Sequence, residues 1–491
     1  MKAYHQYING KWTPSTSKQT FVSSNPAKKS EVLATFSQGT HEDVEHAVFA
    51  AEKALPFWKN TPAPKRGELL LEVARLLRKN KQKLGELVTK EMGKVLKEGL
   101  GDVQEAIDIF EYMAGEGRRL FGHTTPSELK NKFCCTVRQP VGVVGLITPW
   151  NFPFAIPAWK LAPALICGNT IVFKPASDTP LCAATLIEIL EEAGIPPGVV
   201  NMVTGSGEEV GNAIVMHRRL RGISFTGSRE TGEFITKIAG LKKIGLELGG
   251  KNAIIVMDDA DIDLAIEGIL WGAFGTTGQR CTAASRVIVH KSVQKQVEEK
   301  LLKCVRKLKI GSGLDSKTDV GPLINARAVV KTHKYTEIGK KEGARLLCGG
   351  MPEERGGFFY KPTIFTNVKP HMRIAREEIF GPTLSILTAQ DLNDAIQIAN
   401  AIEYGLSSSI YTRNINNAFH SIENIEAGIT YVNASTIGAE VHLPFGGVKA
   451  TGNGTRESGI LGIEEFSEVK TIYIDYSGKL QKAQIDTKKE D

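Results

Sequence analysis

The sequence predicts an α/β protein made of two doubly wound α/β domains and a separate small β element. Two observations support this fold class. From about residue 141 onward, short apolar runs bounded by turn residues alternate with helical stretches, a pattern typical of parallel strands covered by helices on both faces. At 491 residues, the chain is also too long for one hydrophobic core.

Helices are expected first, over residues 41–120, where apolar side chains recur at helical spacing. The strands of a first sheet follow at 143–147, 170–173, 199–203 and 222–225. A helix over 181–193 separates the second of these strands from the third. A second series runs from a strand at 252–256 to about residue 430 and contains helices over 262–274 and 293–308.

The two series predict two domains with a boundary near Gly249-Gly250. The segments 133–138 and 471–476 look like strands that belong to neither sheet, which suggests an element for assembly. The expected division is a first domain over 1–121 and 141–250, a second over 251–449, a return to the first over 450–467, and the β element over 122–140 and 468–491.

Composition and charge narrow the class of protein. Hydrophobic residues make up 42% and charged residues 23% of the chain, which is ordinary for a soluble globular protein. The net charge of +7 is spread along the chain, and the densest basic stretch, 300–309, reads as the solvated face of an amphipathic helix. Nucleic-acid binding is therefore not expected.

Two further observations bear on location. No apolar run approaches the ~18 residues of a membrane span, and the N-terminal residues lack an apolar signal core. The seven cysteines are odd in number and show no CxxC or Cys/His spacing. Neither a disulfide framework nor a metal site is expected. A cytoplasmic protein that does not contact the membrane fits these observations best.

Polar or glycine-rich segments follow four strands of the first sheet. They are Pro149-Trp150-Asn151, Lys174-Pro175-Ala176-Ser177, Gly205-Ser206-Gly207 and Thr226-Gly227-Ser228. Ligands of open α/β sheets bind beyond the carboxyl ends of the strands, and the last two segments open helices whose N–H groups suit a pyrophosphate. Gly205, Gly207 and Gly211 read GxGxxxG rather than GxGxxG, and each segment alone is more often a plain turn. Together the four favour a nucleotide site.

Four single residues are candidates for chemistry, and each has an ordinary structural alternative. Cys281 ends a small-residue stretch, and the preceding Arg280 and backbone N–H groups are expected to favour the nucleophilic thiolate; a buried, inert cysteine is the alternative. Glu247 lies among apolar and glycine neighbours. It is either a general base whose pKa is raised by desolvation or a structural glutamate in a salt bridge. Asn151 is an oxyanion donor or a turn cap. Lys174 ends a buried strand and needs an anion or open solvent nearby.

Together with the segments around them, these residues make the chain resemble the aldehyde dehydrogenase superfamily, and the resemblance extends over essentially its whole length. Seven motifs occur in the order in which the family has them: Pro149-Trp150-Asn151-Phe152-Pro153, Phe173-Lys174-Pro175-Ala176, Phe225-Thr226-Gly227-Ser228, Leu246-Glu247-Leu248-Gly249-Gly250-Lys251-Asn252, Gly278-Gln279-Arg280-Cys281, Glu378-Ile379-Phe380-Gly381-Pro382 and Pro444-Phe445-Gly446-Gly447. The resemblance implies an NAD(P)-dependent enzyme with a Rossmann-like cofactor domain, a catalytic domain and a small element that forms a homodimer or homotetramer.

The resemblance also implies roles for single residues. Cys281 would attack the aldehyde, Asn151 and the Cys281 N–H would stabilise the oxyanion, and Glu247 would activate the water that hydrolyses the thioester. The residues implied at the cofactor are Thr148, Pro149, Trp150, Lys174, Ala176, Ser177, Gly207, Gly211, Phe225, Thr226, Gly227, Ser228, Leu248, Glu378 and Phe380. Those implied at the substrate are Phe152, Trp159, Arg280, Thr282, Ser435 and Thr436.

Ser177 bears on the choice between NADP and NAD. Many members of the family that prefer NAD carry a glutamate at this position, three residues after the lysine, where it pairs with the adenosine ribose. Without that carboxylate, a 2′-phosphate meets no repulsion and finds Lys174 nearby. We therefore expect NADP to be accepted beside NAD, or preferred. Asp178 would restore a preference for NAD if it turned inward.

The loop 433–444 is expected to shape the substrate pocket. It resembles the loop of relatives that act on carboxylate-bearing semialdehydes, notably α-ketoglutarate semialdehyde (2,5-dioxopentanoate) and, less so, aminoadipate semialdehyde. Ser435 and Thr436 either hydrogen-bond such a carboxylate or only shape a turn. Other aliphatic or aromatic aldehydes are alternatives. So are a CoA-acylating reaction, which Glu247 disfavours, and a catalytically silent protein that retains the fold.

Overall fold

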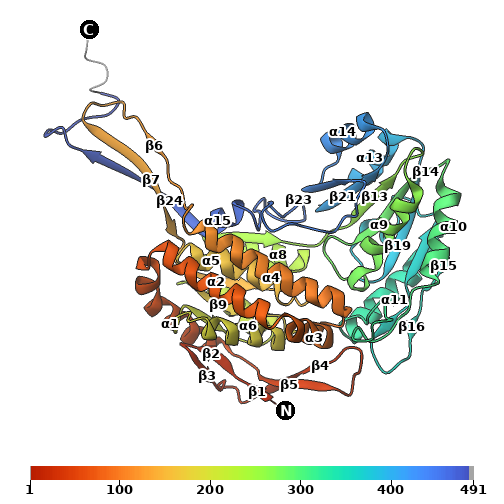
Figure 1. Cartoon of the computed structure of the whole chain (residues 1–491), viewed down its shortest axis with the longest axis horizontal. Coiled ribbons are helices and arrows are strands. Elements are labelled where there is room, and N and C mark those ends of the chain that lie inside the picture. The colour runs from red at the N-terminus through yellow and green to blue at the C-terminus, as the bar shows by residue number, and fades with distance from the viewer. Residues whose placement is uncertain (1, 486–491) are drawn as a thin grey trace, which may run out of the picture.

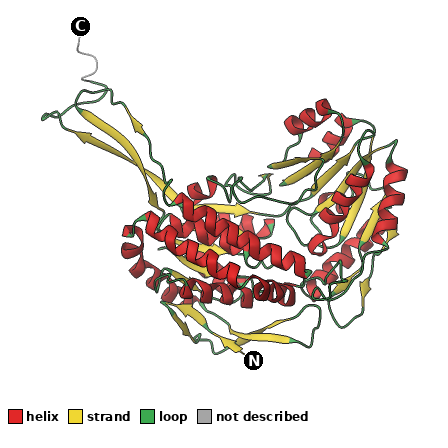
Figure 2. Ribbon diagram, viewed as in Figure 1, coloured by secondary structure: helices red, strands yellow, loops and turns green. Residues whose placement is uncertain are grey.

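The computed structural model describes residues 2–485, which form two α/β units and a projecting β-ribbon. Figure 1 shows the units side by side, with the ribbon leaving the unit that contains the N-terminal helices. In both units, helices cover the strands (Figure 2). This is the two-domain α/β class that the sequence predicts. Within residues 2–485, no helix is both long and apolar enough to cross a membrane.

The first unit is built on a seven-stranded sheet of order β12-β11-β8-β9-β10-β2-β3, in which the first five strands are parallel. Its strands are β2 (Gln6–Ile8), β3 (Lys11–Thr13), β8 (Val143–Ile147), β9 (Thr170–Lys174), β10 (Val200–Met202), β11 (Gly222–Thr226) and β12 (Lys243–Glu247). Four of them lie where the apolar runs predict. The strand β12 was not predicted, because Gly245 and Glu247 interrupt its apolar pattern.

Strands at the N-terminus were not predicted either. The antiparallel hairpin β2–β3 extends the first sheet at its edge. A separate three-stranded sheet has the order β1-β5-β4 and consists of β1 (Lys2–Tyr4), β4 (Thr20–Ser24) and β5 (Val32–Ser37).

Helices of the first unit are α1 (His41–Asn60), α2 (Ala63–Lys79), α3 (Lys81–Met92), α4 (Leu96–Glu116), α5 (Ala155–Ile166), α6 (Pro180–Glu192), the π-helix η1 (Gly207–Gly211), α7 (Asn212–Met216), α8 (Arg229–Ile238) and α15 (Leu461–Glu465). The first four account for the helical prediction over 41–120. Gly93, with φ of 97°, ends α3 in the left-handed conformation that glycine adopts readily. The long helix α4 then packs against α2 and α5, which places one of its faces beside the site.

The second unit is built on another seven-stranded sheet, of order β15-β18-β19-β14-β13-β21-β22, in which only β15 is antiparallel. Its strands are β13 (Asn252–Val256), β14 (Ala284–His290), β15 (Arg345–Cys348), β18 (Thr363–Thr366), β19 (Thr383–Ala389), β21 (Ser407–Tyr411) and β22 (Ile429–Val432). Smaller pairs are β16 (Pro352–Glu353) with β17 (Phe359–Tyr360), and β20 (Tyr404–Gly405) with β23 (Val448–Lys449).

Two helices of the second unit lie where the sequence predicts them, namely α9 (Ile262–Phe274) and α10 (Gln294–Val305). The unit also contains helices that were not predicted: the short 3-10 helix η2 (Gly275–Gly278), α11 (Ala326–Lys341), α12 (Arg373–Arg376), α13 (Leu392–Asn400) and α14 (Ile415–Asn424). The chain passes from the first sheet to the second through Gly249-Gly250. It returns later, where Gly452 forms a bridge with Glu247 and α15 packs against α5.

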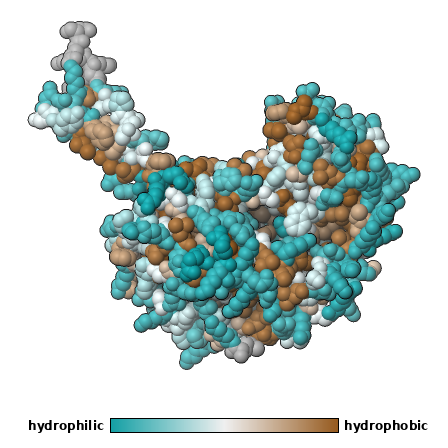
Figure 3. Space-filling model, in the orientation of Figure 1, coloured by the Kyte–Doolittle hydropathy of each residue, from teal (hydrophilic) through white to brown (hydrophobic). Residues whose placement is uncertain are grey.

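The β-ribbon consists of two strands from distant parts of the chain. The strand β7 (Lys132–Pro140) pairs antiparallel along its whole length with β24 (Ser467–Asp475), and β6 (Thr124–Thr125) adds a short third strand. Apolar residues gather along the ribbon (Figure 3), with Phe133, Val469, Tyr473 and Ile474 exposed. The strands β7 and β24 correspond to the predicted segments 133–138 and 471–476, which were expected to belong to neither sheet. Residues 486–491 of the expected β element lie outside the described part of the chain.

Candidate active site

Cys281 lies in a tightly held loop that follows η2. Thr276 and Thr277, just before it, have φ of 50° and 59°, a left-handed conformation that β-branched residues seldom adopt. After the cysteine, Asn252 Nδ2 donates to the backbone oxygens of Cys281 (2.7 Å) and Ala283 (3.0 Å). Both flanks of the cysteine are therefore fixed by specific contacts.

Two cavities meet at Cys281. The first is lined by Glu105, Phe152, Ile156, Trp159, Thr226, Glu247, Leu248, Arg280, Cys281, Thr282, Gly438, Ala439, Phe445 and Glu457. The second is lined by Pro149, Trp150, Asn151, Ile156, Thr226, Gly227, Ser228, Leu248, Gly249, Cys281, Ala328, Lys331, Glu378, Ile379 and Phe380. The first contains residues expected at the substrate, and the second contains residues expected at the cofactor. Cys281 thus lines both cavities.

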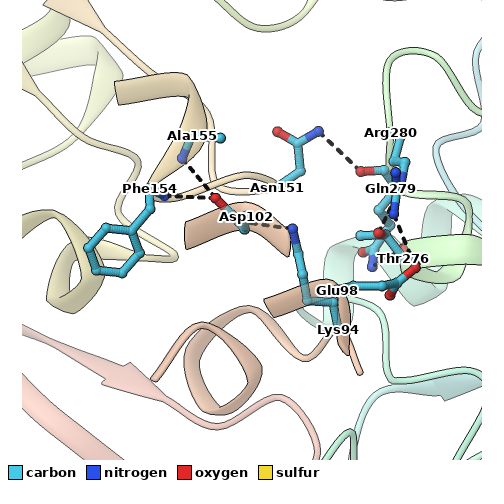
Figure 4. A network of polar contacts seen from close by, with 9 residues as sticks. All are labelled: Lys94, Glu98, Asp102, Asn151, Phe154, Ala155, Thr276, Gln279 and Arg280. Atoms are coloured by element: carbon cyan, nitrogen blue, oxygen red, sulfur yellow. Dashed lines mark hydrogen bonds and ion pairs between the residues drawn. The ribbon is translucent and has the colours of Figure 1, made fainter. Parts of the chain in front are cut away.

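Asn151 lies beside the cysteine loop, as Figure 4 shows. Its side chain is buried, and Nδ2 donates one hydrogen bond to the backbone oxygen of Gln279 (3.1 Å). An amide nitrogen carries two hydrogens, so the second N–H remains available to an oxyanion formed at Cys281. The position therefore leaves open the role of oxyanion donor that the resemblance implies.

Glu247 ends β12 and lines the first cavity. Its carboxylate is buried and makes no hydrogen bond with any residue in the described part of the chain. Burial, reinforced by the nearby Glu457, holds the pKa of Glu247 well above its ordinary range, although Lys160 opposes the shift. The salt bridge that was the alternative is not formed, and the raised pKa suits a general base near neutral pH.

Sequence reasoning missed a buried cluster beneath Glu247. Lys160 forms an ion pair with Glu457 Oε1 and donates to Ser224 Oγ (2.7 Å), and burial raises the pKa of Glu465 to about 7. A signal was present, because Lys160 is a lone charge in the apolar helix α5 and must find a partner there. The cluster places a second carboxyl with a raised pKa, Glu465, near Glu247.

Arg280 does not stabilise the Cys281 thiolate as the sequence suggested. Its guanidinium turns to α4, where Nη2 bonds Glu98 Oε1 (3.1 Å), and Nε donates to Thr276 Oγ1 (2.9 Å). Burial raises the pKa of Cys281 to about 12, and Glu378 and Glu247 act in the same direction. The cysteine is therefore a thiol in the free protein, because desolvation disfavours the thiolate and the arginine is engaged elsewhere.

Carboxylates of α4 hold the loops that carry Asn151 and Cys281 (Figure 4). Glu98 Oε1 also accepts the Thr276 N–H (2.9 Å). Asp102 Oδ1 accepts the N–H groups of Phe154 (3.2 Å) and Ala155 (2.7 Å) at the start of α5, and its other oxygen pairs with Lys94 Nζ (3.0 Å). These contacts were not predicted, because no motif marks them.

Residues expected at the cofactor divide into two groups. Those that line the second cavity are Pro149, Trp150, Thr226, Gly227, Ser228, Leu248, Glu378 and Phe380. Those outside it, at the ends of the neighbouring strands β8, β9, β10 and β11, are Thr148, Lys174, Ala176, Ser177, Gly207, Gly211 and Phe225. Since these strands are adjacent and parallel, all their carboxyl ends lie at one edge of the sheet.

Lys174 and Glu378 are the charged residues among them. The Lys174 ammonium is buried and donates to Pro175 O (3.2 Å), and burial lowers its pKa to about 8, with Asp178 opposing the shift. A Cβ at Gly211 would contact the Lys174 stem at 3.8 Å. Glu378 Oε1 accepts the Gly250 N–H (2.9 Å), and burial raises its pKa.

Helices begin at two of the glycine-rich segments, as expected. Ser206 Oγ accepts the Glu209 N–H (3.0 Å) at the start of η1, and Ser228 Oγ accepts the Thr231 N–H (3.3 Å) at the start of α8. The GxGxxxG stretch thus folds as a π-helical turn that leads into α7. Phe380 packs edge-on against Trp150 in the second cavity, with ring centroids 5.5 Å apart.

Four of the residues expected at the substrate line the first cavity: Phe152, Trp159, Arg280 and Thr282. Ser435 and Thr436 do not. The Ser435 hydroxyl donates to Gly268 O (2.8 Å) and the Thr436 hydroxyl to Thr282 O (2.8 Å). Both are buried, so their role is to shape the loop, and the expected contact with a carboxylate is corrected. Gly438 and Ala439, from the loop 433–444 that was expected to shape the pocket, do line it, whereas Glu105, Ile156 and Phe445 were not expected there.

Comparison with known proteins assigns the family. The model of the aldehyde dehydrogenase family matches residues 12–472. The chain therefore belongs to the aldehyde dehydrogenase family, whose members are NAD(P)-dependent enzymes, and it catalyses aldehyde oxidation.

Particular relatives extend over nearly the whole chain. The α-ketoglutaric semialdehyde dehydrogenase of Bacillus subtilis (strain 168) is 41% identical over 477 residues, which is 96% of this chain and 98% of the relative. The 2,5-dioxopentanoate dehydrogenase of Saccharolobus solfataricus is 43% identical over 478 residues, 96% and 99% of the two chains. A crystal structure of betaine aldehyde dehydrogenase from Staphylococcus aureus in complex with NAD+ is 36% identical, with a TM-score of 0.95 over 97% of this chain and 96% of that chain.

The raised pKa of Cys281 makes a prediction for its reactivity. In the free enzyme, the rate of alkylation by iodoacetamide should rise about tenfold per pH unit from pH 6.5 to 9, because only the thiolate reacts and its fraction grows tenfold per unit below the pKa. The rate is measured by peptide mapping, with Cys281→Ser identifying the reactive site. A plateau of the rate between pH 7 and 8 would show a stabilised thiolate and contradict this account.

The Glu98 contacts make a second prediction. Glu98→Ala leaves the Thr276 N–H and the Arg280 guanidinium without their acceptor, so the cysteine loop should shift and kcat/KM should fall by roughly a hundredfold. Glu98→Gln retains an oxygen that accepts the N–H and should lose less. Kinetics and thermal unfolding report both effects. Glu111→Gln, on the same helix but away from the site, serves as control; wild-type activity and Tm in Glu98→Ala would refute the positioning role.

Proposed function

We propose that this aldehyde dehydrogenase forms a thiohemiacetal and then a thioester on Cys281, and that Glu247 activates the water that releases the acid. The observation that supports this most directly is the position of Cys281 where the two cavities meet. Asn151 lies at one of these cavities and Glu247 at the other. An aldehyde and a hydride acceptor can therefore approach the same sulfur from different sides.

In the first step, the Cys281 sulfur bonds to the aldehyde carbon, the C=O π bond breaks toward its oxygen, and the thiol proton is released to solvent. The free N–H of Asn151 donates to the oxygen that becomes negative, which stabilises the addition. After oxidation, water activated by Glu247 attacks the thioester carbon, the C–S bond breaks and the sulfur regains a proton. The Lys160–Glu457 pair is close enough to influence the charge of Glu247.

The residues around the second cavity fit NAD(P)+. Lys174 is a buried cation whose ammonium donates, within the described chain, to a backbone oxygen alone, and the Glu378 carboxylate packs closely against Gly249, where a Cβ would lie 2.5 Å from Oε2. We infer that Lys174 and Glu378 hold ribose hydroxyls and that the starts of η1 and α8 lie along the pyrophosphate. Bound there, NAD(P)+ supplies the hydride acceptor.

We further propose that NADP+ is accepted beside NAD+. The Ser177 hydroxyl donates to Gly205 O (2.9 Å), so no carboxylate stands where one would repel a 2′-phosphate. Asp178, the residue able to reverse this, accepts a hydrogen bond from Asn325 Nδ2 (2.9 Å) of α11's N-cap. That hydrogen bond holds the Asp178 carboxylate against the second unit, close enough to Lys174 to act on its pKa but engaged with Asn325.

For the substrate, we propose a semialdehyde that carries a carboxylate, such as α-ketoglutarate semialdehyde. Two relatives that are more than 40% identical over nearly the full length bear that name or its synonym. Arg280 lines the substrate cavity with three of its five N–H donors free of hydrogen bonds within the described chain. Phe152 and Trp271 hold its guanidinium at 5.2 Å and 5.0 Å from their ring centroids. A rigid cation of this kind suits a carboxylate tail.

We propose that the β-ribbon joins copies of the chain into a homodimer or homotetramer. It projects from the first unit with exposed apolar side chains on both strands, and exposed apolar surface of this kind marks an interaction site. We also propose that the protein works in the cytoplasm, since all seven cysteines are free thiols.

The proposed roles of Cys281 and Glu247 separate in time. Glu247→Gln should form the thioester but hydrolyse it roughly a hundredfold more slowly, because a general base contributes about that factor or more. Stopped-flow absorbance should then show a burst of about one NAD(P)H per site followed by a slow phase. Glu423→Gln, on the exposed helix α14, should turn over normally. An equal slowing of burst and steady state would exclude a role confined to hydrolysis.

The proposal on the cofactor is tested at Ser177. Wild-type kcat/KM for NADP+ and NAD+ should lie within roughly tenfold of each other, and Ser177→Glu should raise the KM for NADP+ at least tenfold by repulsion of the 2′-phosphate. Ser177→Gln has nearly the same size without the charge and should keep most activity with NADP+. A hundredfold preference of the wild type for NAD+ would overturn the argument.

A further inference from the structure

Glu105 is a carboxyl in the substrate cavity that the reaction does not use. It lies on α4 and lines the same cavity as Cys281 and Arg280. No residue in the described part of the chain donates a hydrogen bond to it, whereas its helix neighbours Glu98 and Asp102 each accept hydrogen bonds from the loops beside the cavity. Glu105 is thus the acid of this group that is free to meet a substrate.

The charges around Glu105 come from three places. On its own helix lie Glu98, Asp102 and Asp108; from the turn before α4 comes Lys94, and from the cysteine loop comes Arg280. Lys94 pairs with Asp102 and Arg280 with Glu98, so these four groups cancel in two pairs. The paired groups therefore add no net charge, Asp108 remains as an acid bonded only to the neutral Gln104 side chain, and ionisation of Glu105 adds one negative charge to this end of the cavity.

The remaining acids of the cavity are Glu247 and Glu457. Glu457 is paired with Lys160, and Glu247 is the proposed base. Burial raises the pKa of Glu105 to about 8, with Asp102 and Asp108 acting in the same direction and Arg280 and Lys94 opposing it. The change of charge therefore falls within the pH range in which such an enzyme can be assayed.

We propose that Glu105 reads the charge of the aldehyde's tail: when protonated it donates a hydrogen bond to a carboxylate held by Arg280, and when ionised it repels that carboxylate. The kcat/KM of the anionic aldehyde is then higher at lower pH, while that of an uncharged aldehyde of the same length does not depend on whether Glu105 is protonated. This inference rests on the proposed substrate class, because it concerns the tail of that substrate.

The test compares 2,5-dioxopentanoate with pentanal, two aldehydes of five carbons, from pH 6.5 to 9.5. The measured quantity is the ratio of their kcat/KM values, because titration of Cys281 or Glu247 affects the chemistry of both aldehydes and largely cancels. In the wild type, the ratio should fall roughly tenfold between pH 7 and pH 9, as the protonated fraction of a group with a pKa near 8 does.

Glu105→Gln supplies an uncharged side chain of the same shape that still donates a hydrogen bond. In this variant, the ratio should stay within about twofold of its low-pH value at every pH. The control Glu111→Gln, an acid of α4 paired with Arg78 outside the cavity, should keep the wild-type profile. A flat ratio in the wild type, or the wild-type fall in Glu105→Gln, would overturn the proposal.

Failure of the proposed substrate gives a different result. If pentanal is oxidised and 2,5-dioxopentanoate is not, the substrate proposal is wrong, and the same ratio is then measured with succinate semialdehyde and butanal. A pH-dependent ratio that Glu105→Gln abolishes still supports charge reading by Glu105, and a ratio that the substitution leaves unchanged refutes it.

Discussion

The site depends on the hydrogen bond that Glu98 accepts from the Thr276 N–H. Thr276 and Thr277 hold a left-handed backbone that the surrounding structure must stabilise, because such a conformation is unfavourable for β-branched residues. The same carboxylate fixes Arg280, and Asp102, about one helical turn further along α4, caps the start of α5. One helix thus holds both the loop that carries Cys281 and the segment that follows Asn151 (Figure 4).

Charged groups in and around the cavity fall into two kinds. Those with a fixed partner, such as Lys94 with Asp102 and Lys160 with Glu457, hold the backbone in place. Those without one, Glu247 and Glu105, face the cavity and have pKa values raised by burial. Titratable groups of the second kind are the ones that can respond to a substrate. The paired charges therefore keep the site rigid, whereas the unpaired carboxyls are the groups that we propose to act in hydrolysis (Glu247) and in substrate selection (Glu105).

Features set by local pattern could be predicted from the sequence. The buried strands β8, β9, β11 and β13 and the helix α9 lie where apolar runs and periodicity placed them. The three candidates Cys281, Asn151 and Glu247 surround the meeting point of the two cavities. The strands and the helix could be predicted because hydrophobic periodicity is a local property of the chain, whereas the roles of the three candidates stay predictions.

Features that depend on distant contacts could not be predicted. Arg280 adjoins Cys281 in sequence, yet its partner Glu98 lies 182 residues away, and that contact turns its charge from the thiol. Ser435 and Thr436 offered hydroxyls to a substrate, but backbone oxygens of α9 and of the cysteine loop take them. Glu105 looks like any other acid of α4 until the fold places it in the cavity.

The most direct test of this account is the identity of the acylated atom during turnover. The enzyme is mixed with its aldehyde and NAD+, quenched in acid within the first turnover, digested and analysed by mass spectrometry. The account predicts an acyl group on the peptide that contains Cys281 and none on the other six cysteines. An unmodified Cys281 peptide during a burst of NADH, or acylation of another residue, would contradict it.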